Sequence, residues 1–166
     1  MRSSPKVFGI TDEMIKTAIK DLKHRGLLQQ QFDQETVLYL SQPLVEKGEV
    51  SEKNELNGLL GVMKKFHGKA RFLYKPHAID TQKKIDKYKR AIPGMSVYDS
   101  KVPVELLYAS EPKIDTVISY ASSGLMFGDK FSGRKINMLS LAGLCEKCVK
   151  PDARDILQKA GVEFIE

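Results

Sequence analysis

The stretch VPVELLYASEPKIDTVISYASSGLMFGDKFSGRKINMLSL, residues 102–141, decides the fold class that the sequence predicts. Residues 102–108 are typical of a strand, and apolar residues at helical spacing predict a helix over 113–123. A buried strand is predicted over 136–141, and we expect the two strands to be buried neighbours. Strands that alternate with helices favour a parallel α/β layer of the βαβ kind.

The residues after this stretch continue the alternation. A helix is predicted over 151–160, because Pro151 stands at its start and Gly161 follows its end. A final strand is predicted over 162–165. The chain from residue 94 to residue 166 is therefore predicted to be a small α/β region.

The residues before Pro93 follow a different pattern. A first helix is predicted from Thr11, whose side chain can cap it, to Gly26, which can adopt the left-handed conformation beyond the helix end. A hairpin is predicted over 27–41, and further helices over 51–68 and 81–91.

The predicted fold class is therefore α+β or α/β. A half made of a helix, a hairpin and further helices (1–93) packs against a small βαβ-like half (94–166). Pro93-Gly94 breaks the chain between them. The two halves are either two domains or parts of one domain, and the sequence leaves both possibilities open.

The composition is that of a globular chain of 166 residues, with 42% apolar and 29% charged residues. No run of about 18 apolar residues is present, so no membrane-spanning segment is predicted. The first residues lack the apolar core of a secretory signal, and two cysteines are too few for a secreted disulfide scaffold. These features predict a cytoplasmic protein without a membrane partner.

The positive charge is concentrated in KKFHGKARFLYKPHAIDTQKKIDKYKR, residues 64–90. Ten Lys and Arg residues against two Asp residues give this segment a formal charge of +8, while the whole chain carries +6. Cations neutralise phosphates, and the aromatic rings among them can stack on unpaired bases. The segment predicts a protein that binds DNA or RNA; a solvated basic face, or a surface for an acidic protein or lipid, is the alternative. The candidate contacts are Lys64, Lys65, Lys69, Arg71, Tyr74, Lys83, Lys84, Lys87 and Arg90.

The segment TDEMIKTAIKDLKHRGLLQQQFDQETVLYLS, residues 11–41, resembles the recognition helix and wing of winged-helix DNA-binding domains. The resemblance implies that Lys16, Lys20 and Lys23 face phosphates or base edges. An ordinary helix and hairpin, with the lysines in solvent, is the alternative.

The glycine-rich segment SSGLMFGDKFSGRK, residues 122–135, favours a different function. Glycines allow a ligand to approach the backbone closely, and the neighbouring cations can meet a phosphate. The segment matches neither the dinucleotide fingerprint nor the P-loop pattern. It is either a surface loop or the site of a small α/β enzyme or phosphate-ligand-binding protein, whose candidate residues are Gly124, Gly128, Lys130, Gly133 and Arg134.

Cys145 and Cys148 have the C-x-x-C spacing that suits a shared metal ion or redox exchange, while inert thiols are the alternative. No second cysteine pair exists in the sequence, so neither a metal nor another cofactor is predicted. No spacing of histidine, serine or carboxylate residues identifies a catalytic set, and whether the chain is an enzyme stays open. A homo-oligomer or a larger assembly is compatible with the sequence.

Overall fold

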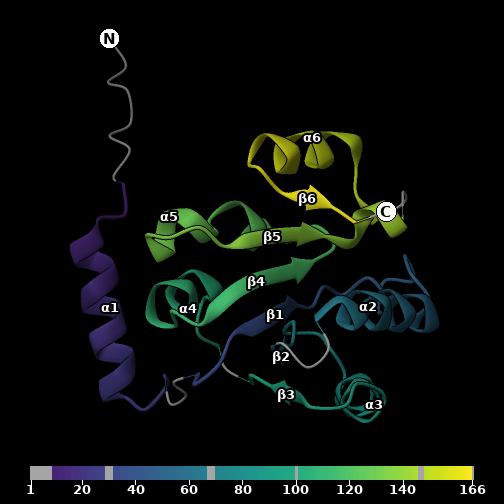
Figure 1. Ribbon diagram of the computed structural model, residues 1–166, viewed down its shortest axis with the longest axis horizontal. Coiled ribbons are helices and arrows are strands. Elements are labelled where there is room, and N and C mark those ends of the chain that lie inside the picture. The colour runs from purple at the N-terminus through teal and green to yellow at the C-terminus, as the bar shows by residue number, and fades with distance from the viewer. Residues whose placement is uncertain (1–8, 29–31, 67–69, 100, 146–147, 166) are drawn as a thin grey trace.

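The computed structural model describes residues 9–28, 32–66, 70–99, 101–145 and 148–165 (Figure 1). The strands of these residues form one six-stranded sheet in the order β3-β2-β1-β4-β5-β6, and all neighbours pair in parallel. The strand bounds are Thr36–Leu40 (β1), Arg71–Lys75 (β2), Met95–Val97 (β3), Ile114–Ser119 (β4), Asn137–Ser140 (β5) and Glu163–Phe164 (β6). The order reverses between β1 and β4, as in doubly wound nucleotide-binding sheets.

Helices precede and connect these strands. Their bounds are Asp12–His24 (α1), Glu52–Phe66 (α2), Gln82–Ala91 (α3), Val104–Ser110 (α4), Gly128–Ser132 (α5) and Pro151–Lys159 (α6), with 3₁₀ helices at Ser123–Met126 (η1) and Leu141–Leu144 (η2). Thr11 and Thr81 cap α1 and α3, because their side-chain oxygens accept hydrogen bonds from backbone N–H groups of the first turns. The four helices predicted at 11–26, 51–68, 81–91 and 151–160 are confirmed, as is the strand at 162–165.

The sheet is covered on both faces, and the central strand β1 shows how. All five residues of β1 are buried. Val37 and Tyr39 belong to the core cluster that includes residues of α2 and α3, whereas Leu38 and Leu40 belong to the cluster that includes residues of α4. Successive side chains of a strand point to opposite faces, so a strand buried on both faces is apolar throughout.

Helix α1 lies at the side of the molecule, away from the sheet (Figure 1). None of its residues is buried, and it packs mainly against α4. Asp12 and Glu13 occupy its first turn and Lys23 and His24 its last, which places each charge near the helix end of opposite polarity. The capping and charged residues at its ends therefore stabilise this helix more than its packing against the rest of the protein does.

The hairpin predicted over 27–41 is wrong. Among the described residues of this range only β1 is a strand, and it pairs in parallel with β2 and β4, which come from far along the chain. Residues 29–31 lie outside the described part. No antiparallel wing therefore follows α1 in the described residues, and the arrangement that the winged-helix resemblance implied for Lys16, Lys20 and Lys23 is not formed.

Two elements of the stretch 102–141 are the opposite of those predicted. Residues 102–108 were predicted to be a strand but lead into α4, and the predicted helix over 113–123 contains β4, a strand between β1 and β5. β4 is apolar or β-branched at most positions because both of its faces are buried, and such a run also matches helical spacing. The predicted pairing of 102–108 with 136–141 is therefore wrong, since β5 pairs with β4 and β6.

The α/β class is confirmed, in the form of an all-parallel sheet with helices. Strands from both sides of residue 93 lie in this one sheet, and the division into 1–93 and 94–166 stays a prediction. Within the described residues, no helix combines the length and the apolar character needed to cross a membrane.

Leu38, in the middle of β1, is fully buried, whereas Leu27 is 44% exposed. We expect Leu38→Ala to lower the free energy of unfolding by about 2–5 kcal/mol, because it leaves a cavity under α4. The same change at Leu27 removes the same atoms from a site in contact with water and should cost less than about 1 kcal/mol. Urea denaturation of both variants checks this, and equal losses would contradict the central place of β1.

Candidate site at the carboxyl ends of the central strands

Polar and charged side chains gather beyond the carboxyl ends of β1, β2 and β4. In doubly wound sheets the strand order reverses at a crevice beyond these ends, and ligands bind there. Here the reversal lies between β1 and β4. The loops that follow the three strands begin at Ser41, Pro76 and Tyr120. Because the strands are neighbours about 5 Å apart, these loops lie side by side.

The ammonium group of Lys84, in the first turn of α3, is the centre of this region. Its side chain is 3% exposed. Its Nζ lies 3.1 Å from Asp80 Oδ1, and 3.3 Å from both Glu46 Oε2 and Glu55 Oε2. Two longer contacts of 3.5 Å join Nζ to Ser41 Oγ and to the carbonyl oxygen of Gln42. One cation therefore connects the loops after β1 and β2 with helices α2 and α3.

The charge of Lys84 is maintained by its carboxylate neighbours. Burial alone would lower the pKa of Lys84, but the negative charges of Glu55, Asp80 and Glu46 outweigh burial and raise this pKa above its ordinary value. Lys84 is therefore a permanent cation at neutral pH.

Glu55, in the first half of α2, has no exposed surface. Its two carboxylate oxygens accept hydrogen bonds of 2.6 Å from the hydroxyl groups of Tyr39 and Tyr88. Burial, followed by the charge of Glu55, raises the pKa of both tyrosines. The hydroxyls therefore stay protonated and serve as donors, and Glu55 is satisfied by two hydroxyls and one ammonium group.

Asp80 holds the turn that carries His77. Its Oδ2 accepts a hydrogen bond of 2.7 Å from the hydroxyl of Tyr74 and one of 2.9 Å from the backbone N–H of His77. The His77 side chain is exposed, and its Nδ1 accepts a hydrogen bond of 3.3 Å from the backbone N–H of Ile79. A ligand at this edge would therefore meet the ring through Nε2.

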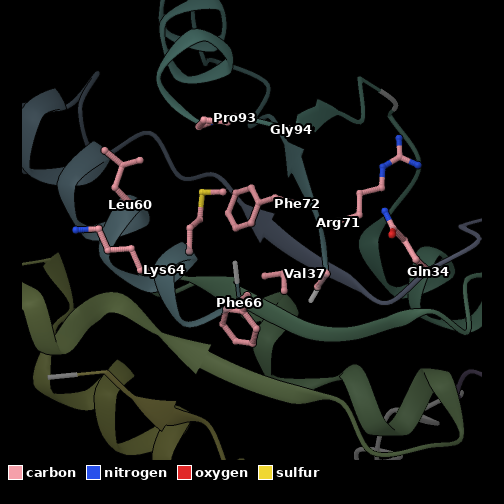
Figure 2. A pocket seen from close by; sticks show the side chains of 11 residues that line it. Gln34, Val37, Leu60, Lys64, Phe66, Arg71, Phe72, Pro93 and Gly94 are labelled. Carbon is pink, nitrogen blue, oxygen red and sulfur yellow. The ribbon is translucent and has the colours of Figure 1, made fainter. Parts of the chain in front are cut away.

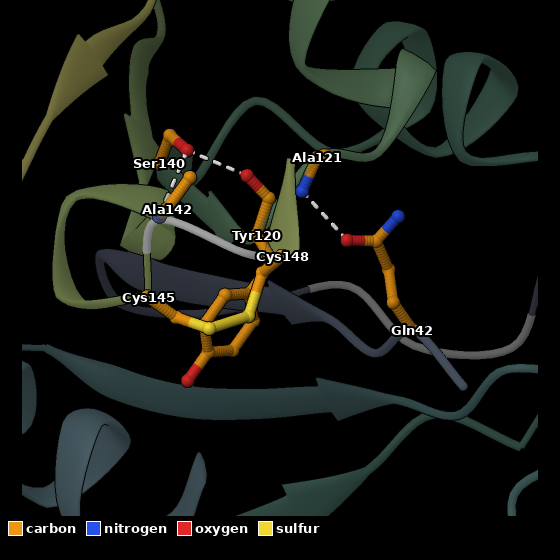
Figure 3. The surroundings of a disulfide bond; sticks show 7 residues. All are labelled: Gln42, Tyr120, Ala121, Ser140, Ala142, Cys145 and Cys148. Carbon is orange, nitrogen blue, oxygen red and sulfur yellow. Dashed lines mark hydrogen bonds between the residues drawn. A yellow bond between two sulfur atoms is a disulfide. The ribbon is translucent and has the colours of Figure 1, made fainter. Parts of the chain in front are cut away.

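The loop after β4 is tied to the loop after β1 by Gln42. Its side-chain Oε1 accepts a 2.6 Å hydrogen bond from the backbone N–H of Ala121 (Figure 3). Ser122 Oγ then accepts a hydrogen bond from the N–H of Gly124, whose carbonyl oxygen accepts one from the hydroxyl of Tyr108. Ser123 is exposed at the start of η1. This turn therefore places hydroxyl and N–H groups beside the reversal of the sheet.

Cys145 and Cys148 form a disulfide after η2, close to the ring of Tyr120 at the end of β4 (Figure 3). Ser140 Oγ, at the end of β5, donates a hydrogen bond to the carbonyl oxygen of Tyr120. The loops after β4 and β5 are thus joined as well. Among the described residues, no group of three or more His, Cys, Asp and Glu side chains is arranged to hold a metal ion.

Two of the residues predicted to contact nucleic acid are buried. Tyr74 is fully buried, and the Lys84 side chain is almost fully buried, so neither reaches a base or a phosphate. Lys69 lies outside the described residues. The others are exposed or half-buried on three elements: Lys64 and Lys65 end α2, Arg71 begins β2 and donates to Ser96 Oγ, and Lys83, Lys87 and Arg90 lie on α3, where Lys87 pairs with Glu52.

A cavity of about 410 Å³ lies at the opposite, amino ends of β1 and β2 (Figure 2). Its lining is mainly apolar, with Lys64 and Arg71 among the few polar side chains. Figure 2 shows Phe72 pointing into it between α2 and the turn at Pro93 and Gly94. We place the candidate site at the carboxyl ends instead, because buried charges, hydroxyls and backbone donors converge there.

The glycine-rich segment 122–135 runs from the carboxyl ends of the strands to their amino ends. Gly124 lies at the carboxyl end of β4, whereas the Arg134 guanidinium donates to the carbonyl oxygens of Glu111 and Ile114 near the amino end of β4. Gly128 packs against Met138, Lys130 is exposed, and Gly133 has a φ of 66°. Only the beginning of the segment lies at the candidate site, and a ligand-binding role for the five predicted residues stays a prediction.

Sequence reasoning did not identify Gln42, Glu55 or Asp80 as part of a site. Each is a single polar residue in a loop or helix, without a spacing that is typical of a motif. The available signal was positional, since Ser41 and Gln42 directly follow a strand that is buried throughout. Recognising it required the strand order, which places the ends of β1, β2 and β4 together.

Comparison with known proteins identifies a family. The family model described as Alpha-2,8-polysialyltransferase (POLYST) matches residues 9–139, well over half of the chain. Among solved structures, the chain is similar to Thermosulfurimonas dismutans KpsC, a beta Kdo 2,4 transferase, with 15% sequence identity and a TM-score of 0.45. The match covers 92% of this chain and 56% of that chain, so the chain spans little more than half of that structure's length. No curated protein matches the sequence.

The interpretation of residues 64–90 as a nucleic-acid-binding surface is wrong. The family match is to enzymes that transfer sugars, and neither DNA nor RNA is indicated as a partner. The charge pattern was misleading because the segment spans a helix end, a buried strand and a second helix, and two of the predicted contacts, Tyr74 and Lys84, are buried in the fold. The alternative, a small α/β enzyme, is the better supported of the two interpretations.

Glu55 offers a direct test of the buried cluster. We expect Glu55→Ala to lower the free energy of unfolding by about 3–5 kcal/mol, because Lys84 would stay buried with one carboxylate fewer and two tyrosine hydroxyls would lose their acceptor. Glu52→Ala on the same helix removes a partly exposed pair with Lys87 and should cost about 1 kcal/mol or less. Chemical denaturation of both variants measures the difference, and similar losses would show that the cluster contributes little.

Proposed function

The chain belongs to the alpha-2,8-polysialyltransferase family, and from this we propose that it is a glycosyltransferase, or part of one, that binds a nucleotide-activated sugar. The observation that carries the proposal is the family match over residues 9–139. The acceptor is the growing end of a glycan, of the kind made in capsule polysaccharide synthesis. A sheet with reversed strand order supports the proposal, because nucleotides bind at such reversals.

Sugar transfer sets a clear requirement for the site. A bond forms between an acceptor hydroxyl and the anomeric carbon of the donor sugar, and the bond from that carbon to a phosphate oxygen breaks. The electron pair of the broken bond goes to the phosphate oxygen, and the proton of the acceptor hydroxyl passes to water. Hydrogen-bond donors placed around the phosphate stabilise the negative charge that develops there. Such stabilisation is commonly a large part of enzymatic rate enhancement.

His77, Ser122 and Ser123 are the residues that we propose for this task. They lie on the loops after β2 and β4, which flank the end of β1. Two neighbouring inter-strand distances add to about 10 Å, a span that a sugar nucleotide can bridge. We propose that the imidazole Nε2 of His77 and the serine hydroxyls donate hydrogen bonds to the phosphate of the sugar nucleotide. Gln42 holds the serine turn in place through Ala121.

The proposal includes a cytoplasmic location. The Cys145–Cys148 disulfide is the feature that opposes it, because disulfides are rare in reducing compartments. The two cysteines are the only ones in the chain, so thiol counting in the protein isolated under anaerobic conditions reports directly on this bond.

Sugar-nucleotide turnover tests the proposed function. A panel of sugar nucleotides, including nucleotide-activated sialic acid, is offered with an oligosialic acid acceptor, and release of the nucleotide is measured. We expect turnover of the sialic acid donor, and losses of about 100-fold or more in kcat for His77→Ala and Ser122→Ala. His24→Ala on α1, a matched control far from the site, should keep wild-type kinetics.

Absence of turnover and of binding for every donor in the panel would contradict the proposed function. If the wild type turns over a donor and the His77 and Ser122 variants are as active as the wild type, the proposed function stands but the placement of the site is wrong.

A further inference from the structure

We propose that Lys84 and Asp80 form a positioning pair, which holds the His77 turn in the geometry needed at the sugar-transfer site. The inference rests on the proposed function and adds to it two residues that do not touch the ligand. The Lys84 side chain is 3% exposed and that of Asp80 has no exposed surface, so both act through other groups.

The geometry of Asp80 carries the first step. One carboxylate oxygen receives the Lys84 ammonium group at 3.1 Å, and the other receives the backbone N–H of His77 at 2.9 Å. The Tyr74 hydroxyl donates to the same second oxygen at 2.7 Å, so this oxygen is held from the side of the sheet. The His77 backbone is therefore hydrogen-bonded to a group that is itself fixed from two directions.

The placement of Lys84 carries the second step. Glu46 and Glu55, both 3.3 Å from Nζ, fix the ammonium group from the loop after β1 and from α2. Lys84 and Asp80 are four residues apart, with the Thr81 cap of α3 between them. The pair thus fixes the start of α3 and the turn before it as one unit against β1 and α2.

The energetics favour positioning over simple stabilisation. Transfer of an ammonium group and three carboxylates out of water costs several kcal/mol per ion, and an apolar core of similar volume is often at least as stable. Such a cluster is best explained by the single arrangement that it enforces. The cluster lies directly beneath the loops of the candidate site. The 3.5 Å contacts of Lys84 Nζ with Ser41 and Gln42 add a weaker connection toward the loop after β4.

The central variant is Lys84→Met, which keeps the length of the side chain and removes its charge. Lys84→Arg keeps the charge, and Lys83→Met changes the exposed neighbour on the same helix, which makes it the matched control. Tyr74→Phe removes one donor to Asp80 without leaving a charge unpaired, and it serves if Lys84→Met does not fold. Folding is followed by circular dichroism at the assay temperature.

Two readouts separate positioning from stability. The first is the kinetic constants for the sugar-nucleotide donor, where folded Lys84→Met should lose about ten-fold or more in kcat while Lys84→Arg recovers part of the loss. The second is the NMR signal of the His77 ring in the free protein, assigned by comparison with His77→Ala. We expect the signal to shift or broaden in Lys84→Met and in Tyr74→Phe, and to be unchanged in Lys83→Met.

An unchanged His77 signal in a folded Lys84→Met or Tyr74→Phe variant overturns the proposal, and so does a kcat within about two-fold of wild type for both variants. The NMR experiment needs no substrate. It therefore gives its answer even if the wild type neither turns over nor binds any sugar nucleotide, in which case the proposed function fails and the positioning of His77 is judged by its signal alone.

Discussion

The parallel pairing of β1 with β2 on one edge and β4 on the other is the constraint on which the rest of the structure depends. All five residues of β1 are buried, so its backbone groups must find partners in neighbouring strands. Parallel partners require crossovers. Those that lead to β2 and β3 pack α2 and α3 on one face of the sheet, and the one from β3 to β4 packs α4 on the other. The reversal of strand order, and with it the candidate site, follows from this pairing.

The polar groups at the carboxyl ends form a layer between the apolar core and the surface loops. The rings of Tyr39 (β1), Tyr74 (β2) and Tyr88 (α3) pack together. The ring centroids of Tyr39 and Tyr74 are 5.5 Å apart, and those of Tyr74 and Tyr88 are 5.9 Å apart. Their hydroxyls donate hydrogen bonds to Glu55 and Asp80. The same three side chains thus serve the core through their rings and the charged cluster through their oxygens. Core packing and loop geometry are coupled there, because a ring cannot move without disturbing a hydrogen bond.

The sequence predicted those elements whose signals are local. Thr11 caps α1 as expected, and Pro151 begins α6. Signals that depend on the fold failed: Ile114, Val117 and Ile118 have helical spacing, yet they lie on a strand because β1 and β5 cover both of its edges. The candidate site was missed for the same reason. Lys84 was taken for a solvent-facing cation, since nothing in its local sequence reveals that Glu46 and Glu55, far along the chain, join the neighbouring Asp80 around it.

The lack of buried residues in α1 has a consequence for how the molecule opens. Amide hydrogens exchange with solvent when a segment unfolds locally, and the free energy of that opening reflects how much the segment buries. Helix α1 contributes no buried side chain, so its detachment leaves both core clusters intact. Its amides belong to a separate, weakly held cooperative unit, while those of β1 exchange only when the sheet itself comes apart.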